Sequence, residues 1–119
     1  MSFSRTRPPT SQALYWEPKF QNDIEPRQLD LSLWVQEFLN DALALALPNI
    51  VPAQLGGLRV ASGAFGVPPV SLAGNVVTIW FAGGLENQTY AVMVSAVTAN
   101  GRTKNFDCRL FIRPVNAAG

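Results

Sequence analysis

The clearest pattern in this chain is an alternation of apolar and polar positions near its C-terminus. The last predicted strand turns one set of side chains inward: Phe106, Cys108, Leu110 and Ile112. The strand before it turns a matching set inward: Tyr90, Val92, Val94 and Ala96. A period of two residues is that of a β-strand with one buried face, and most of these residue types favour strands. The pattern therefore predicts a β-hairpin.

The loop of this hairpin has to bring the two inward sets face to face. A two-residue turn would mismatch them, whereas an odd number of loop residues aligns them. We therefore expect a three-residue loop at 99–101, with Asn100-Gly101 as turn residues and Gly101 in the left-handed conformation. The pair Gly83-Gly84 is predicted to reverse the chain earlier, after an apolar strand.

That earlier strand, at residues 76–82, is apolar on both faces. Val77, Ile79 and Phe81 form one consistent face, so Trp80 has to cover something on the other. A central strand that lies between a sandwich core and a partner surface shows this pattern. Trp80 is therefore a candidate core or interface residue.

The first half of the chain carries weaker patterns. Residues 1–28 contain prolines and scattered aromatic residues without a strand or helix period, which indicates an extended arm. Residues 29–35 alternate as a strand, although apolar residues with helical spacing compete over residues 31–39. We expect a strand there, followed by a short turn or helical piece through Ala46 that Pro48 ends.

A short strand is expected at residues 58–62, and residues 63–74 connect it to the next one. Pro68-Pro69 would remove ladder hydrogen bonds, so this connection is not a central strand. Several short strands without a long helix predict an all-β fold, an immunoglobulin-like antiparallel β-sandwich with an extended N-terminal arm. The predicted parts are an arm at residues 1–28, a β-sandwich at 29–114 and a C-terminal tail at 115–119.

Composition excludes several classes of function. Nine basic and eight acidic residues in a chain of 119 leave a net charge of +1, so no cationic surface for nucleic acid is expected. The first ten residues lack the apolar core of a secretory signal. Residues 42–58 are uncharged, but Pro48 and Pro52 interrupt them, and a membrane span is therefore not expected either.

An enzyme is not expected. The chain has no His, and Cys108 lies at an inward strand position, so the common nucleophilic triads and His-based metal sites cannot be assembled. Acidic pairs such as Asp23 with Glu25, or Glu37 with Asp41, are interpreted as solvated surface charges. We assign no catalytic, cofactor-binding or metal-binding residue.

Interface candidates come from the arm and from the hairpin tip. Tyr15, Trp16 and Phe20 are large apolar groups in a segment that cannot build its own core, and they could anchor the arm on a neighbour. In the alternative, the arm folds back across its own sandwich and the aromatics plug an edge. Deleting residues 1–27 is expected to leave the sandwich folded. Arg102 could donate forked hydrogen bonds to a neighbouring subunit, or it could be a solvated tip residue or an intramolecular clamp.

Several of these segments together resemble a known family. They are the predicted strand at residues 29–35, Gly57-Leu58-Arg59-Val60, the strand and turn at residues 77–84, Tyr90-x-Val92, Thr98-x-x-Gly101-Arg102 and Leu110-x-Ile112-Arg113. Over residues 28–114 the chain resembles small virion proteins of tailed bacteriophages, namely fibre–tail adaptor proteins and related immunoglobulin-like modules. It departs from the shorter relatives in its longer arm and in an apolar insertion at residues 43–56. The resemblance implies a structural role without catalytic residues.

The expected function is that of a non-enzymatic virion adaptor, which links tail or portal components to fibres through arm and sheet-face contacts. Its expected partners are other virion proteins, and closed rings or trimers are expected in a particle assembled in the host cytoplasm. One alternative is a capsid decoration protein bound to the major capsid protein. Another is a carbohydrate-binding receptor module, which would need exposed aromatics at loop tips; the tips at residues 85–87 and 99–101 have none.

Overall fold

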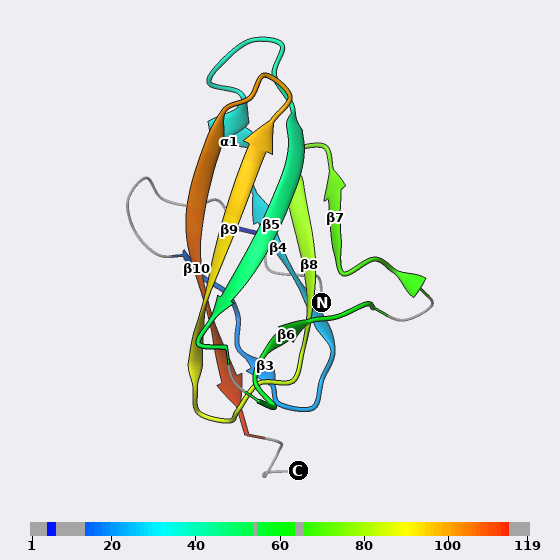
Figure 1. Cartoon of the computed structure of the whole chain (residues 1–119), viewed down its shortest axis with the longest axis vertical. Helices are drawn as coiled ribbons and strands as arrows, with labels where there is room; N and C mark the ends of the chain where they lie inside the picture. The colour runs from blue at the N-terminus through cyan, green and yellow to red at the C-terminus, as the bar shows by residue number, and fades with distance from the viewer. Residues whose placement is uncertain (1–4, 7–13, 54, 64–65, 115–119) are drawn as a thin grey trace.

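The computed structural model describes residues 5–6, 14–53, 55–63 and 66–114, and these form two β-sheets packed face to face (Figure 1). The short helix α1 spans Ser32–Val35. The strands are β1 (Arg5–Thr6), β2 (Leu14–Tyr15), β3 (Lys19–Phe20), β4 (Glu25–Asp30), β5 (Leu43–Val51), β6 (Arg59–Val60), β7 (Val70–Ala73), β8 (Val76–Ala82), β9 (Thr89–Thr98) and β10 (Thr103–Arg113). The prediction of an all-β sandwich is confirmed, whereas its immunoglobulin-like classification stays a prediction.

In the described part of the chain, each of the two sheets has five strands. The first sheet has the order β1-β4-β8-β6, with β7 paired to β8 beside β6. The second has the order β2-β10-β9-β5, with β3 paired to β10 beyond β2. The antiparallel ladders β5–β9–β10 and β4–β8 form the centre of each sheet, while β1, β2 and β3 add short parallel pairs.

The core lies between the sheets and uses the alternating side chains that the sequence pattern selected. All eight inward residues predicted for β9 and β10 are buried. Cys108 is among them, and burial, with a smaller contribution from the charge of Asp107, raises the pKa of its thiol to about 12. Cys108 is therefore a core residue and not an activated nucleophile.

The hairpin between β9 and β10 has the three-residue loop that the alternation required. Val94 lies opposite Phe106 and Val92 opposite Cys108, so the inward sets coincide. The Thr98 N–H donates to the Arg102 carbonyl at 2.9 Å, which leaves residues 99–101 as the loop. Gly101 has a φ of +90°, in the left-handed region.

The prediction of a strand at residues 29–35 is wrong in its position. β4 ends at Asp30, and the next residues form α1. The Asp30 carboxylate accepts hydrogen bonds from the N–H and hydroxyl of Ser32, at 3.0 and 2.6 Å, which turns the chain out of the strand. Leu31 and Val35 then point into the core with helical spacing, and both are fully buried.

The turn or helical piece predicted through Ala46 is also wrong, because β5 begins at Leu43. Alanine and leucine favour helices, but the Leu-Ala-Leu-Ala-Leu run also has a strand period, and pairing with β9 decides between the two. Intrinsic propensity is a weak preference that tertiary pairing overrides.

Pro48 does not end the element as predicted but lies within β5. β5 is an edge strand, and Pro48 lies opposite Val94 of β9. Along antiparallel strands, residue pairs that exchange backbone hydrogen bonds alternate with pairs that do not. Because the N–H of Thr98 bonds to Arg102, the even-numbered residues of β9 direct their backbone N–H and C=O groups towards β10. The nitrogen of Pro48 therefore faces away from β9, where no ladder bond is lost.

The arm also differs from the sequence prediction. The predicted boundary at residue 28 falls inside β4, whose backbone pairs with β8 along its whole length. β2 and β3 pair with the edge of β10. Residues 14–28 therefore form part of both sheets, and the predicted tail at residues 115–119 lies outside the described residues.

The connection between β6 and β8 agrees with the sequence prediction in part. β6 falls within the strand expected at residues 58–62, and the connection after it contains β7. β7 pairs with β8 on the same side as β6, so the connection supplies an edge strand and not a central one.

Replacing Gly101 by Val should lower the free energy of unfolding by about 1–2 kcal/mol, because an L-residue is strained in the left-handed region. A Cβ added at this position would have no atom within 4 Å, so backbone strain is the main cause. Urea unfolding measures the change. Gly101→Asn is the control, since Asn tolerates this conformation, and an equal loss for Asn would contradict the explanation.

Deleting residues 1–27 should abolish cooperative unfolding, in contrast to the expectation from sequence, because β2, β3 and half of β4 are removed. Circular dichroism and urea unfolding of the truncated chain test this. Deletion of residues 115–119, which follow β10, is the control and should leave the unfolding transition intact. A cooperative transition in the N-terminal truncation would show that these strands are dispensable.

Candidate interaction surfaces

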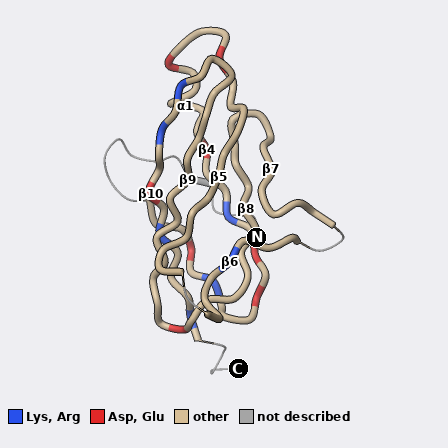
Figure 2. Tube along the Cα trace, viewed as in Figure 1, with Lys and Arg blue, Asp and Glu red and all other residues tan. Residues whose placement is uncertain are grey.

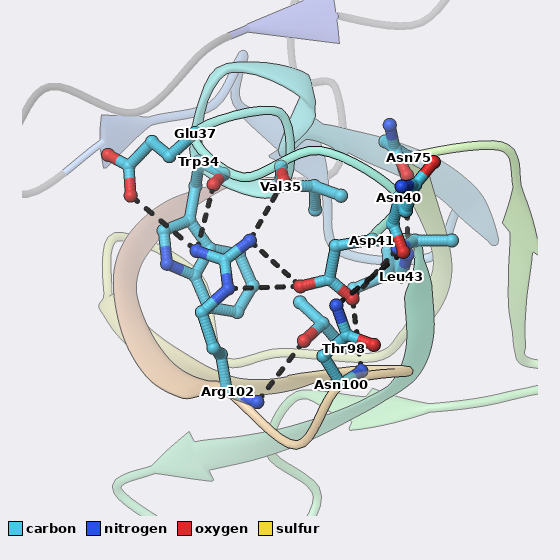
Figure 3. A network of polar contacts seen from close by, with 11 residues as sticks. Trp34, Val35, Glu37, Asn40, Asp41, Leu43, Asn75, Thr98, Asn100 and Arg102 are labelled. Carbon is cyan, nitrogen blue, oxygen red and sulfur yellow. Dashed lines mark hydrogen bonds and ion pairs between the residues drawn. The ribbon is translucent and has the colours of Figure 1, made fainter.

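A network of polar contacts around Arg102 closes one end of the sandwich (Figure 3). Arg102 Nε and Nη2 both lie 3.0 Å from Asp41 Oδ2. The same guanidinium donates from Nη1 to the carbonyl of Trp34 at 3.2 Å, and from Nη2 to that of Val35 at 2.8 Å. The hairpin tip is thereby joined to the C-terminal end of α1 and to the loop before β5.

The Asp41 side chain at the centre of this network is 0% exposed. Burial acts to raise the pKa of its carboxyl group, but the hydrogen bonds outweigh burial and lower the pKa to about 2. The donors are the Thr98 hydroxyl, the N–H groups of Asn100 and Ala42, and the Arg102 guanidinium. The sequence interpretation of Asp41 as a solvated surface charge is therefore wrong.

Aromatic rings flank the Arg102 guanidinium. Its Cζ lies 5.1 Å from the ring centroid of Trp34 and 4.5 Å from that of Phe38. Trp34 in turn packs edge-on against Phe106, with the ring centroids 5.5 Å apart. Arg102 thus acts as an intramolecular clamp, one of the alternatives that its sequence context left open.

A buried cation, Lys19, holds the opposite end of the sandwich. Lys19 is fully buried, and its Nζ donates to the carbonyls of Phe20 and Gly83, each at 2.8 Å. Burial lowers the pKa of Lys19, and the negative charges of Glu25 and Asp23 offset only part of this effect. Lys19 therefore ties β3 to the crossing between the two sheets.

The turn pair at this crossing has no room for side chains. Gly83 has a φ of +73°, and a Cβ there would lie 2.9 Å from the Gly57 carbonyl oxygen. Gly84 has a φ of +107°, and its Cβ would lie 2.7 Å from the side chain of Ile112. The pair carries the chain from β8 in the first sheet to β9 in the second.

Trp16 and Trp80 lie against their own chain. Trp16 is only 4% exposed, packs 5.6 Å from Phe81 between ring centroids, and donates from Nε1 to the Gln28 carbonyl at 2.9 Å. Trp80 is half-buried on the outer face of β8, and a Cβ at Gly63 would lie 2.9 Å from its indole. For Trp16, the structure shows the alternative in which the arm folds back.

Tyr15 and Phe20, by contrast, are exposed by 70% and 41%. Tyr15 lies opposite Arg109 and Phe20 opposite Arg113, and both of these arginines point outward from β10. Residues paired across neighbouring strands have side chains on the same side of a sheet. Both aromatics therefore belong to the outer face of the second sheet.

On its β5 and β9 side, this outer face is largely apolar and has no charged residue. We define the β5–β9 face as the outward residues of these two strands: Leu45, Leu47, Asn49, Val51, Ala91, Met93, Ser95 and Val97. Leu45, Leu47 and Val51 are 45%, 57% and 52% exposed. Figure 2 shows no charged residue along β5 or β9, and such a face is typical of a protein contact.

A second exposed group lies at the clamped end. We define the apical knob as Leu33 on α1 with Phe38 and Leu39 in the loop before β5, exposed by 61%, 58% and 89%. The sequence prediction missed both groups, because it assigned residues 36–46 to a turn or helical piece. The Leu-Ala alternation at residues 43–47 was the signal that could have revealed β5 and its outer face.

Most of the chain matches a known protein family. A family model described as Podophage GP4 fiber-tail adaptor protein gp77 matches residues 19–111, from β3 into β10. The chain belongs to this family. No curated protein matches the chain.

Membership in the fibre–tail adaptor family gives this chain a structural role as a component of a phage virion. Such an adaptor interacts with other virion proteins, such as those of tail and fibre, and the family points away from enzymatic activity. Among the described residues, no helix is long and apolar enough to cross a membrane.

Replacing Asp41 by Asn should lower the melting temperature at pH 7 and flatten its dependence on pH between about 4 and 2. The pKa of Asp41 in the folded chain, about 2, lies below its ordinary value of 3.8. Its contribution to stability is therefore complete above pH 4 and is lost as the pH falls towards 2.

Thermal unfolding across this pH range tests the Asp41 prediction. Glu86→Gln is the control, because Glu86 is an exposed carboxylate in the crossing between the sheets. Equal pH profiles for wild type and Asp41→Asn would show that the clamp does not contribute to acid sensitivity.

Proposed function

We propose that this chain is a non-enzymatic adaptor that joins a tail or portal component to fibres, and that the outer face of its second sheet is a contact with another virion protein. The observation that carries this proposal is the uncharged β5–β9 face, with Tyr15 and Phe20 on the β10 side of the same sheet. Arm and sheet thus contribute to one surface.

The composition of this surface supports protein contact. Exposed Leu and Val side chains on β5 gain free energy when a partner removes them from water, at about 25 cal/mol per Å². Tyr15 and Phe20 add rigid aromatic area, and Arg109 is already paired with Asp107 at 2.8 Å. Neither β5 nor β9 has a charge that would have to be desolvated.

The size of the surface determines what it can hold by itself. Residues 45–51 span about 20 Å along β5, and four strands span about 14 Å across, which gives roughly 280 Å² of projected area. A standard interface buries about 800 Å² on each partner. We therefore expect the free chain to be monomeric, with closed rings forming only in the particle, where further contacts add to this face.

Replacing Leu47 by Lys should reduce incorporation into particles by about tenfold or more, because an ammonium group would be buried against an apolar partner. Phage lacking the gene are complemented in trans with the variant, and its copies per particle are measured by quantitative mass spectrometry. Leu55→Lys is the control, since Leu55 is fully exposed outside this face.

Normal incorporation of the Leu47→Lys chain would contradict the sheet-face contact. The wild-type copy number in the same experiment also separates the two structural roles. An adaptor is present at the low copy number of a tail or neck ring, whereas the alternative of capsid decoration requires hundreds of copies on the head.

A further inference from the structure

The apical knob is the most exposed apolar group at the clamped end of the sandwich. It lies at the top of Figure 1, where the chain passes from α1 through the loop to β5. Leu39, which is 89% exposed, lies two residues before the clamped Asp41. Singly exposed apolar residues are ordinary on protein surfaces, but this group combines three of them with an internal support.

The support fixes the knob from both sides. On the α1 side, Arg102 binds the carbonyls of Trp34 and Val35, and Asp30 holds the first residue of the helix. On the β5 side, Arg102 and the N–H of Asn100 bind Asp41. Side chains on such a rigid frame lose little conformational entropy on binding, as is found for the anchor residues of interfaces.

The charge beside the knob is negative. Arg102 is the one cation of the network among the described residues, and it contacts both Asp41 and, at 3.5 Å, Glu37. The Glu37 side chain is 59% exposed. The apolar knob therefore has an exposed carboxylate at its border, which a cationic group on a partner would complement.

These observations argue against a second copy of this chain as the occupant. A two-fold contact would place the Glu37 carboxylates of both copies near each other, where like charges repel. Three side chains also cover far less than the roughly 800 Å² per partner that a stable dimer needs.

We propose that the apical knob inserts into an apolar socket of another virion protein, with a Lys or Arg at the rim of that socket. This inference rests on the proposed adaptor function and extends it. The knob lies at one end of the sandwich and the β5–β9 face along its side, so the chain has two separate contacts. Two contacts are what a protein needs to bridge two components.

The test uses phage that lack the gene, complemented in trans with Leu39→Asp. Copies of this chain and of the fibre protein per particle are measured by quantitative mass spectrometry, and the melting temperature of the purified variant is measured separately. Because Leu39 packs against nothing in the core, the melting temperature should stay at the wild-type value. The number of copies per particle of either this chain or the fibre protein should fall by about tenfold or more.

Leu55→Asp is the matched control, because it places the same charge at a fully exposed leucine outside the knob. Its particles should have the wild-type content of both proteins. Glu37→Lys tests the charge. It should lower the copy number of the same protein that Leu39→Asp lowers, while Glu37→Gln should have a smaller effect on that copy number.

The outcomes separate this inference from the function on which it rests. If Leu47→Lys is excluded from particles while Leu39→Asp particles are normal, the adaptor function stands and the knob contact is overturned. A change in the oligomeric state of the purified Leu39→Asp chain would overturn it in favour of self-association. If the wild-type chain is absent from particles, the adaptor function itself fails.

Discussion

The pairing of Arg102 with the buried Asp41 is the interaction on which one whole end of this protein depends. It joins three segments that are distant in sequence: α1, the loop before β5 and the tip of the β9–β10 hairpin. The Asp41 side chain is shielded from solvent, so loss of the Arg102 bonds would leave its carboxylate with fewer partners and would destabilise this end. Hydrogen bonds from Thr98, Asn100, Arg102 and Ala42 together outweigh burial and lower the pKa of Asp41.

Lys19 has the corresponding role at the opposite end, and its position explains why the N-terminal strands belong to the sandwich. The ammonium group is buried but surrounded by backbone carbonyls, including that of Gly83. Arg27 adds bonds to the carbonyls of Glu17 and Pro18. A Pro-rich segment that cannot form a core alone is thus held by cations that bind its backbone.

Two exposed apolar groups remain, and they are the surfaces that we propose for assembly. The β5–β9 face is uncharged, and Pro48 removes a donor from the free edge beside it, which favours contact through the face over strand addition at the edge. The apical knob is separate from this face. This arrangement fits a family of structural adaptors, whose function requires contacts with more than one protein.

The sequence by itself determined the β9–β10 hairpin, because its alternation, its register and Gly101 are consistent over residues that are close in the chain. It also determined the buried Cys108 and the apolar strand β8. Tertiary structure decided whether Leu43-Ala44-Leu45 is strand or helix, whether Asp41 is solvated or buried, and whether Trp16 faces its own core. The first two outcomes depend on partners 40 or more residues away, β9 for β5 and Arg102 for Asp41, and local pattern contains no information about such pairing.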